Sequence, residues 1–257
     1  MTVNFLKLNE EKTEFTLFIS QHARESFPTA SIRIGDDTVT PVKCVRNLGA
    51  FFDEHLSMES HIAQVTKSGY YHLRRISSIR KFLSREATER VVHAFITSKL
   101  DLNNALLYGV EDYQLKPLEN LQKSAARLVT CTRKYDHISP IMRQRHWLPI
   151  KARIIFKISL LVYKCLHGLA PAYLMDFIKT VDHPKNLRSK VQGHLIVPKA
   201  RIGLGDRAFS VCGPRIWNKL PSMLQTAPSL DIFKQRLKTH LFNPVNVNKL
   251  WVVSEWF

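Results

Sequence analysis

The chain has 257 residues and a mass of 29.7 kDa, and 45% of its residues are hydrophobic and 10% aromatic. This composition supports a buried core and excludes a chain that is disordered throughout. Lys and Arg number 38 against 21 Asp and Glu, which gives a formal net charge of +17 and a pI near 9.9. Such an excess favours a polyanionic partner, with nucleic acid first and an acidic membrane surface second.

The charge is divided unevenly along the chain. Residues 1–55 carry six basic and eight acidic side chains, which gives a net charge of −2. The remaining residues carry 32 basic and 13 acidic side chains, a net charge of +19. This shift predicts a domain boundary near residue 55, with any basic binding surface beyond it.

The first 55 residues are predicted to form strands. A run rich in β-forming residues spans 15–20, and apolar and polar residues alternate over 31–42 around the turn signal Gly35-Asp36-Asp37. A further extended segment is expected over 45–52, passing through Leu48-Gly49. These strands predict a small antiparallel sheet.

From Ser57 onward the apolar residues recur at helical spacing. Helices are predicted over 57–84, from Ser84 to before Gly109, after Pro117, from Ser139-Pro140 to near Trp147, over 151–167 and over 229–242. The second of these helices is expected to bury Ala87, Val91, Ala94, Phe95 and Leu102. Residues 181–228 are predicted to form loops with short strands at 195–197 and 208–211. The fold class expected is therefore α+β, mostly α.

The cysteines and the hydropathy of the sequence indicate where in the cell the protein is located. The four cysteines, Cys44, Cys131, Cys165 and Cys212, are dispersed and favour a reducing environment. Nothing at the N-terminus has the pattern of a signal peptide, and the most apolar run, 154–163, is short and is interrupted by a lysine. We expect an intracellular protein, in the nucleus or cytoplasm, that is neither secreted nor embedded in a membrane.

The clearest candidate site is a basic stripe on the helix predicted over 57–84. No acidic residue occurs between His61 and Arg85. On a helical wheel Lys67, Arg74, Lys81 and Arg85 fall within roughly 40° of one another, opposite the apolar face. Arg75 and Tyr71 belong to the same polar region. This pattern suits contact with a phosphate backbone, although a solvated helix face is the alternative interpretation.

No residue pattern indicates catalysis or metal binding. The Asp36-Asp37 pair is interpreted as turn chemistry, because no third carboxylate stands nearby in the sequence. Cys131, His137, His146 and Cys212 lack the close pairs of a structural zinc site. They are expected to be core cysteines and surface histidines, and Trp147 and Trp217 are expected to anchor loops on the helices.

Four stretches of the sequence contain motifs that occur together in one protein family. They are Leu6–Phe15, which contains Asn9, Lys12, Thr13 and Glu14; Val45–Met58, which contains Asn47, Leu48 and Gly49; Arg133–Ile138 with His146-Trp147-Leu148-Pro149; and Gly205–Phe209 with Pro214–Pro221. In combination they resemble the C-terminal part of the reverse transcriptase of non-LTR (LINE-like) retrotransposons. The resemblance extends to about Phe242.

The resemblance implies an organisation for the chain. Residues 1–55 would be the last palm strands, 56–135 a helical thumb-like domain and 136–242 a C-terminal helical and loop region, and 243–257 remain unassigned. The basic stripe would then lie where a thumb holds the template–primer duplex. Lys12 would correspond to a family lysine near the incoming nucleotide.

The same resemblance argues against activity of this chain alone. Family enzymes hold two Mg²⁺ ions with an upstream palm aspartate and a Tyr/Phe-Ala-Asp-Asp turn. Both would precede residue 1, and Asp36-Asp37 follows the Lys-Thr-Glu stretch instead of preceding it. Met1 is therefore expected to begin a truncated copy that binds RNA or DNA with little sequence preference and needs no cofactor.

Three other interpretations remain open. The helical body could be a protein-interaction module whose charge maintains solubility. A second chain could supply the missing palm, pairing through an exposed palm edge. An active polymerase is the third and is disfavoured by the missing aspartates.

Overall fold

The computed structural model of the protein describes residues 9, 12–18, 31–34, 37–180, 194–201 and 203–251. Within them the chain is mostly helical with two small antiparallel sheets, so the expected α+β, mostly α class is confirmed. One sheet pairs β1 (Ile32–Ile34) with β2 (Asp37–Val39), and the other pairs β3 (Cys44–Asn47) with β4 (Ala50–Asp53).

The helices fall into two groups. The first comprises α1 (Glu59–Ile79), η4 (Arg80–Phe82), α2 (Arg85–Val92), η5 (His93–Thr97), α3 (Ser98–Asp101), η6 (Asn104–Leu107) and α4 (Asp112–Thr130). The second comprises α5 (Ser139–Gln144), α6 (Ile150–Leu166), α7 (Ala172–Met175), η7 (Gly205–Arg207), α8 (Phe209–Asn218), α9 (Ser222–Gln225), α10 (Leu230–Leu241) and α11 (Pro244–Trp251).

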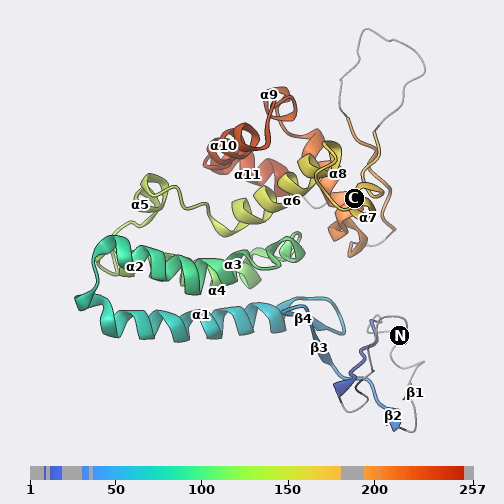
Figure 1. Ribbon diagram of the computed structural model, residues 1–257, viewed down its shortest axis with the longest axis horizontal. Coiled ribbons are helices and arrows are strands. Elements are labelled where there is room, and N and C mark those ends of the chain that lie inside the picture. Colours follow the sequence, from blue (N-terminus) through green and yellow to red (C-terminus); the bar gives the residue numbers. More distant parts are fainter. Residues whose placement is uncertain are drawn as a thin grey trace.

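Figure 1 shows the two groups as layers, with the strands at one end of α1. The long helices α1 and α4 and the segment from α2 to α3 run side by side in one layer. Helix α6 is the centre of the other layer and packs against α8, α10 and α11. The outer side of α1 is thus left free of other helices.

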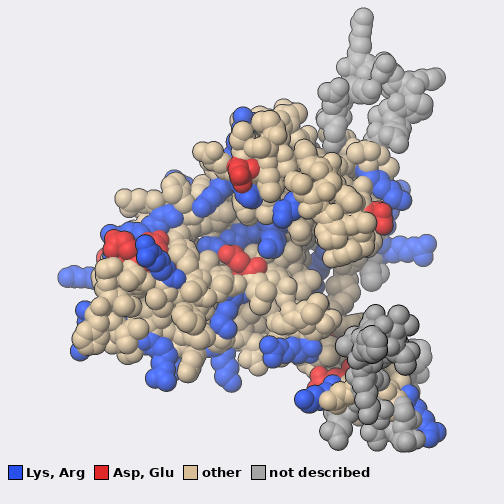
Figure 2. Space-filling view, in the orientation of Figure 1, with Lys and Arg blue, Asp and Glu red and all other residues tan. Residues whose placement is uncertain are grey.

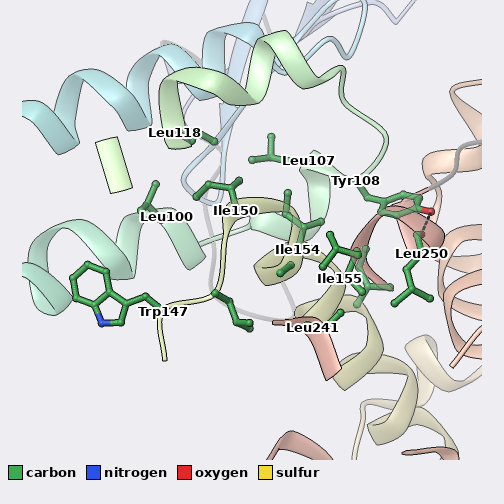
Figure 3. Close-up of a cluster of buried hydrophobic side chains, with 14 of the residues drawn as sticks. Leu100, Leu107, Tyr108, Leu118, Trp147, Ile150, Ile154, Ile155, Leu241 and Leu250 are labelled. Atoms are coloured by element: carbon green, nitrogen blue, oxygen red, sulfur yellow. Dashed lines mark hydrogen bonds between the residues drawn. The ribbon is translucent and has the colours of Figure 1, made fainter. Parts of the chain in front are cut away.

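One hydrophobic core joins the layers. Leu100, Leu107 and Leu118 from the first layer face Ile150 and Ile154 from α6 in Figure 3. Burial of this continuous apolar surface is the main force that holds the layers together.

Polar contacts reinforce the join at the far end of the core. The Tyr108 hydroxyl donates a hydrogen bond to the backbone oxygen of Leu250 across 3.1 Å, and the Tyr108 ring meets that of Trp251 edge-on. Helix α11, for which no element was predicted, is therefore packed into the body of the molecule.

The strand predictions are partly correct. The hairpin expected over 31–42 forms β1 and β2, while its turn residues Gly35 and Asp36 lie outside the described part. The segment expected over 45–52 is a hairpin of two strands, because Leu48 and Gly49 both take positive φ and reverse the chain.

Of the three remaining strand predictions, two are wrong where the structure describes the residues and one is reduced to a single bridge. Residues 15–18 form no strand, although Val42 N–H donates to the Phe15 oxygen across 2.8 Å, and the end of that run lies outside the described residues. The run 195–197 yields one bridge, between Thr180 and Leu195. Residues 209–211 begin helix α8, because their apolar positions continue at helical spacing and bury against α6.

The predicted helices are present, but the one expected from Ser84 to before Gly109 ends at Asp101, and the region expected as loops over 181–228 contains α8 and α9. Several boundaries also differ. Helix α4 begins at Asp112, and Pro117 lies inside it, where its missing N–H removes one backbone hydrogen bond. Ser139 is the first residue of α5 and not its cap. Ser84 and Ser229 do cap α2 and α10, accepting hydrogen bonds from Ala87 N and Ile232 N.

The buried face of the second predicted helix is wrong. The inward residues are Thr88, Val92, Ile96 and Leu100, whereas Phe95 is 47% exposed and Ala94 and Leu102 are also exposed. The shift from Ala87 and Val91 to Thr88 and Val92 already occurs in α2, before the π-helical turn η5. Beyond Val92 the cause is this turn, which widens the helix and turns Ile96 and Leu100 inward. A face computed at 3.6 residues per turn therefore drifts away from the real one.

Candidate nucleic-acid interface

Helix α1 is positioned by the sheet that precedes it. The Asp53 carboxylate at the end of β4 accepts hydrogen bonds from Ser57 N at 2.8 Å and Met58 N at 2.9 Å, just before the helix begins. Burial disfavours the charged form, but these hydrogen bonds outweigh it and lower the pKa of Asp53. The carboxylate thereby satisfies the backbone at the positive end of α1.

The inner face of α1 contacts α4. Ile62, Gly69 and Ile76 are buried there at the spacing of two turns. The opposite face holds Lys67 and Arg74, and both side chains are exposed. The apolar period therefore determines which basic residues reach solvent.

All six residues of the predicted interface are exposed, but they do not share one helix. Lys67, Tyr71, Arg74 and Arg75 lie on α1, whereas Lys81 lies in η4 and Arg85 begins α2. The chain leaves the helical path at Leu83, which is extended, so that Ser84 can cap α2. The wheel angle assigned to Arg85 is therefore wrong, because Arg85 lies beyond this break, whereas Lys81 lies before it.

The cations of this surface form no ion pair with a carboxylate in the described part of the chain. We call Lys67, Arg74, Arg75, Lys81 and Arg85 the basic face; none of them takes part in an ion pair among the described residues. Figure 2 shows Lys and Arg side chains projecting from the edge of the molecule formed by α1, with little acidic colour beside them. The basic face therefore carries five cations that form no ion pair among the described residues, with Glu86 as an acidic neighbour of Arg85.

Two of its cations lie over exposed aromatic rings. The Arg75 guanidinium is 5.7 Å from the centre of the Tyr71 ring, and the Lys81 ammonium is 4.9 Å from that of Phe82. Tyr71 and Phe82 are both more than half exposed. These contacts orient the cations without neutralising their charge.

Asn9, Lys12, Thr13 and Glu14 form local contacts near the basic face. Asn9 Oδ1 accepts from Lys12 N at 3.2 Å, and the Thr13 hydroxyl donates to the Asn9 backbone oxygen at 2.7 Å. The exposed Glu14 lines a cavity of about 540 Å³ that also includes Lys67. The described motif residues are thus joined by local hydrogen bonds, and Glu14 lies near α1.

The Asn47-Leu48-Gly49 stretch forms the hairpin turn between β3 and β4. Leu48 is 90% exposed, and its left-handed backbone is held by a hydrogen bond from Asn103 Nδ2 to the Leu48 oxygen at 3.0 Å. This contact joins the hairpin to the first helical layer.

The His146-Trp147-Leu148-Pro149 stretch links the two helical layers. Trp147 and Leu148 are buried, the Leu148 oxygen accepts from Gln122 Nε2 at 2.8 Å, and Pro149 precedes the first residue of α6. Trp217 is buried as well. The expectation of a buried tryptophan that anchors a loop is confirmed for Trp147, whereas Trp217 packs from within α8 and not from a loop.

The residues considered for zinc binding have different surroundings. Cys212 is buried, and burial raises the pKa of its thiol to about 12. Cys131, His137 and His146 are exposed. Across the described residues no three His, Cys, Asp or Glu side chains are grouped as a metal would require.

The Asp36 and Asp37 side chains, which were interpreted as part of a turn, lie outside what the structure describes.

Sequence reasoning missed two features. Arg207 donates hydrogen bonds to three backbone oxygens of the first layer, and Asp206 pairs with Arg215 at 2.6 Å. His72 and Phe95 form stacked rings beside the basic face. The recurrence of apolar residues at every fourth position from Thr88 could have revealed that Phe95 points outward.

Comparisons with protein-family models, with curated proteins and with solved structures find no match to the chain. No helix among the described residues is long and apolar enough to cross a membrane.

Proposed function

We propose that this chain is a retrotransposon-derived fragment of an RNA-directed DNA polymerase that binds nucleic acid of the template–primer kind without catalysing nucleotide transfer. The observation that supports the proposal is the basic face, five exposed cations that form no ion pair in the described structure. Its ligand is RNA, DNA or their hybrid, inside the cell, in the nucleus or cytoplasm.

The geometry of α1 suits a phosphate backbone. The helix has 21 residues, a length of about 30 Å at 1.5 Å per residue. The spacing between phosphate charges along a duplex is much shorter than this helix, so several cations of the basic face can each contact a different phosphate. Contacts with phosphates carry no base information, which is why we propose weak sequence preference.

The absence of catalysis rests on the resemblance. Family enzymes hold Mg²⁺ with a Tyr/Phe-Ala-Asp-Asp turn, and the sequence contains no such run. We therefore assign Mg²⁺ to the complete family enzyme and no cofactor to this chain. Lys12 would have no activated nucleotide on which to act.

The salt dependence of binding tests the proposed function. If about five phosphates are contacted, log affinity should fall against log salt concentration with a slope of roughly −4 to −5. Fluorescence anisotropy with a labelled RNA–DNA duplex measures this slope. Changing all five residues of the basic face to Gln should weaken binding strongly at low salt and flatten the slope.

A charge-matched variant supplies the control. Five lysines that are exposed outside the basic face can be changed to Gln together: Lys116, Lys134, Lys179, Lys199 and Lys249. This variant has the same net charge as the first but should keep most of the affinity and slope. If the two variants lose the same affinity, binding depends only on the total charge of the protein, and the assignment of the basic face is refuted. Template-dependent primer extension by the chain would refute the absence of catalysis.

The protein-interaction alternative is supported by a different feature. Each sheet has two strands within the described structure, and a cavity of about 680 Å³ lies between residues 12–18 and the β3–β4 hairpin, lined in part by Phe15, Phe18 and Phe52. Strand edges and apolar rings of this kind can receive another chain, including one that supplies a palm.

A further inference from the structure

Three aromatic rings form a continuous row on the surface between α1 and η5. Tyr71 and His72 meet edge-on with ring centres 5.3 Å apart, and His72 stacks on Phe95 at 5.2 Å with an interplanar angle of 27°. We call these three residues the aromatic row. Tyr71 also belongs to the predicted interface, so the row adjoins the basic face.

The π-helical turn is what brings Phe95 to this position. With Val92 and Ile96 fully buried, η5 directs the intervening Phe95 outward beside α1. Phe95 is 47% exposed and Tyr71 is 55% exposed. π-Helical turns occur frequently at functional sites, and here the turn exposes a ring that regular α-helical periodicity would have placed inward.

Positive charge surrounds the row. Arg75 lies over Tyr71, and burial together with the nearby charge of Lys99 lowers the pKa of the His72 imidazole. Neither Arg75 nor Lys99 forms an ion pair among the described residues. Flat rings between free cations complement a ligand that has both aromatic faces and negative charge.

From this arrangement we propose that the aromatic row stacks against an unpaired base of a single-stranded extension next to the duplex. The inference rests on the proposed function, because the basic face would hold the adjoining duplex. Bases inside a duplex are already stacked on both faces, whereas a base in an overhang has a free face for Phe95 or Tyr71. Arg75 and Lys99 would meet the flanking phosphates. One stacked base should increase affinity roughly 10-fold.

The test compares three ligands of otherwise identical sequence by fluorescence anisotropy. They are a blunt duplex, the same duplex with a base-bearing overhang, and the same duplex with an abasic overhang. The abasic strand keeps the added phosphates and lacks the bases, so it separates stacking from charge. We expect the base-bearing overhang to bind roughly 10-fold tighter than the abasic one.

Substitutions at Phe95 locate the effect. Phe95→Ala and Phe95→Leu should remove the preference for the base-bearing overhang and leave affinity for the blunt duplex unchanged, because Phe95 lies outside the basic face. Phe95→Trp should preserve or increase the preference. Phe95→Leu retains apolar bulk, so it distinguishes a stacked base from general hydrophobic contact. Tyr113→Ala, at an exposed ring on α4, is the matched control and should change nothing.

The outcomes separate the two proposals. Tight binding of the blunt duplex with equal affinity for both overhangs would overturn the stacking site and leave the proposed function standing. Failure of all three ligands to bind would overturn both. The protein could instead self-associate through the row. If Phe95→Leu preserves this self-association and Phe95→Ala abolishes it, the row is a contact between copies and the stacking site is overturned.

Discussion

Neighbouring basic residues at the end of α1 have different roles. Arg80 is half-buried and donates hydrogen bonds to the backbone oxygens of Leu128 at 3.1 Å and Val129 at 3.4 Å in α4, and to that of Leu83 at 2.8 Å. It therefore satisfies carbonyl groups near the C-terminus of α4, where a cation is favourable. Lys81, the next residue, is exposed and bonded to no carboxylate in the described structure. Charge counted along the sequence does not distinguish these roles, because the difference lies in burial.

A buried histidine makes the stability depend on pH. His61 is 2% exposed, its Nδ1 has no hydrogen-bond partner, and burial lowers its pKa below the usual 6.5. Above pH 6.5 both the folded and the unfolded states are neutral at this site. As the pH falls below 6.5 the unfolded state binds a proton first, so stability is lost until the folded-state pKa is reached.

His61→Leu should reduce this pH dependence. Urea unfolding at about pH 7.5 and about pH 5.5 measures it, and a full pKa unit corresponds to about 1.4 kcal/mol. The wild type should lose more stability on acidification than the variant, while exposed His137→Gln should behave as the wild type. The same acid-induced loss in His61→Leu and the wild type would contradict the prediction.

At the scale of elements, the packing of α1 on α4 depends on a missing side chain. A Cβ placed on Gly69 would overlap the Cδ2 atom of the fully buried Leu121 and would lie 3.2 Å from its Cγ. Glycine usually weakens a helix by about 1 kcal/mol relative to alanine. Its presence in the middle of α1 is explained by this close approach.

Gly69→Ala should therefore destabilise the protein by about 1 to 3 kcal/mol, since overpacking exceeds the gain in helix propensity. Chemical denaturation measures the free energy of unfolding. Leu121→Ala provides the second arm of a double-mutant cycle, because in that background Gly69→Ala should be neutral or stabilising. If Gly69→Ala is stabilising by itself, α1 and α4 are not packed as closely as described.

For the whole molecule, a single guanidinium connects regions that are distant in sequence. Arg207 donates to the backbone oxygens of Leu56 at 2.8 Å, Tyr108 at 3.1 Å and Leu106 at 3.3 Å. It thus ties the segment before α8 to the start of α1 and to the end of η6. Nearby, the buried Asp206 pairs with Arg215 on α8. The Gly205–Phe209 stretch, noted only for its resemblance, has a structural role.

Arg207→Met should cost about 2 to 4 kcal/mol, because three carbonyl acceptors lose a charged donor. The stability of Arg207→Lys should lie between those of the wild type and Arg207→Met, since an ammonium cannot reproduce the planar arrangement of donors. Urea unfolding measures both, and exposed Arg201→Met is the matched control. Equal stability of Arg207→Met and Arg201→Met would show that the network contributes nothing.

Local sequence signals predicted the elements that depend on local physics. The apolar period gave α1, α6 and α10, and the serine caps at Ser84 and Ser229 were correct. A cap or an apolar stripe acts within about one or two helical turns, so its residues lie together in the sequence. The short strand expected over 208–211 failed because four residues are too few to distinguish a strand from a buried helix.

By itself, the sequence determined the fold class, the long helices and the excess of positive charge on the chain beyond residue 55. Only the tertiary structure decided which cations are free, as with Arg80 and Lys81, and which ring is exposed, as with Phe95 beyond the π-helical turn. Both outcomes depend on contacts between segments far apart in the chain, whose burial and hydrogen bonds no local pattern encodes.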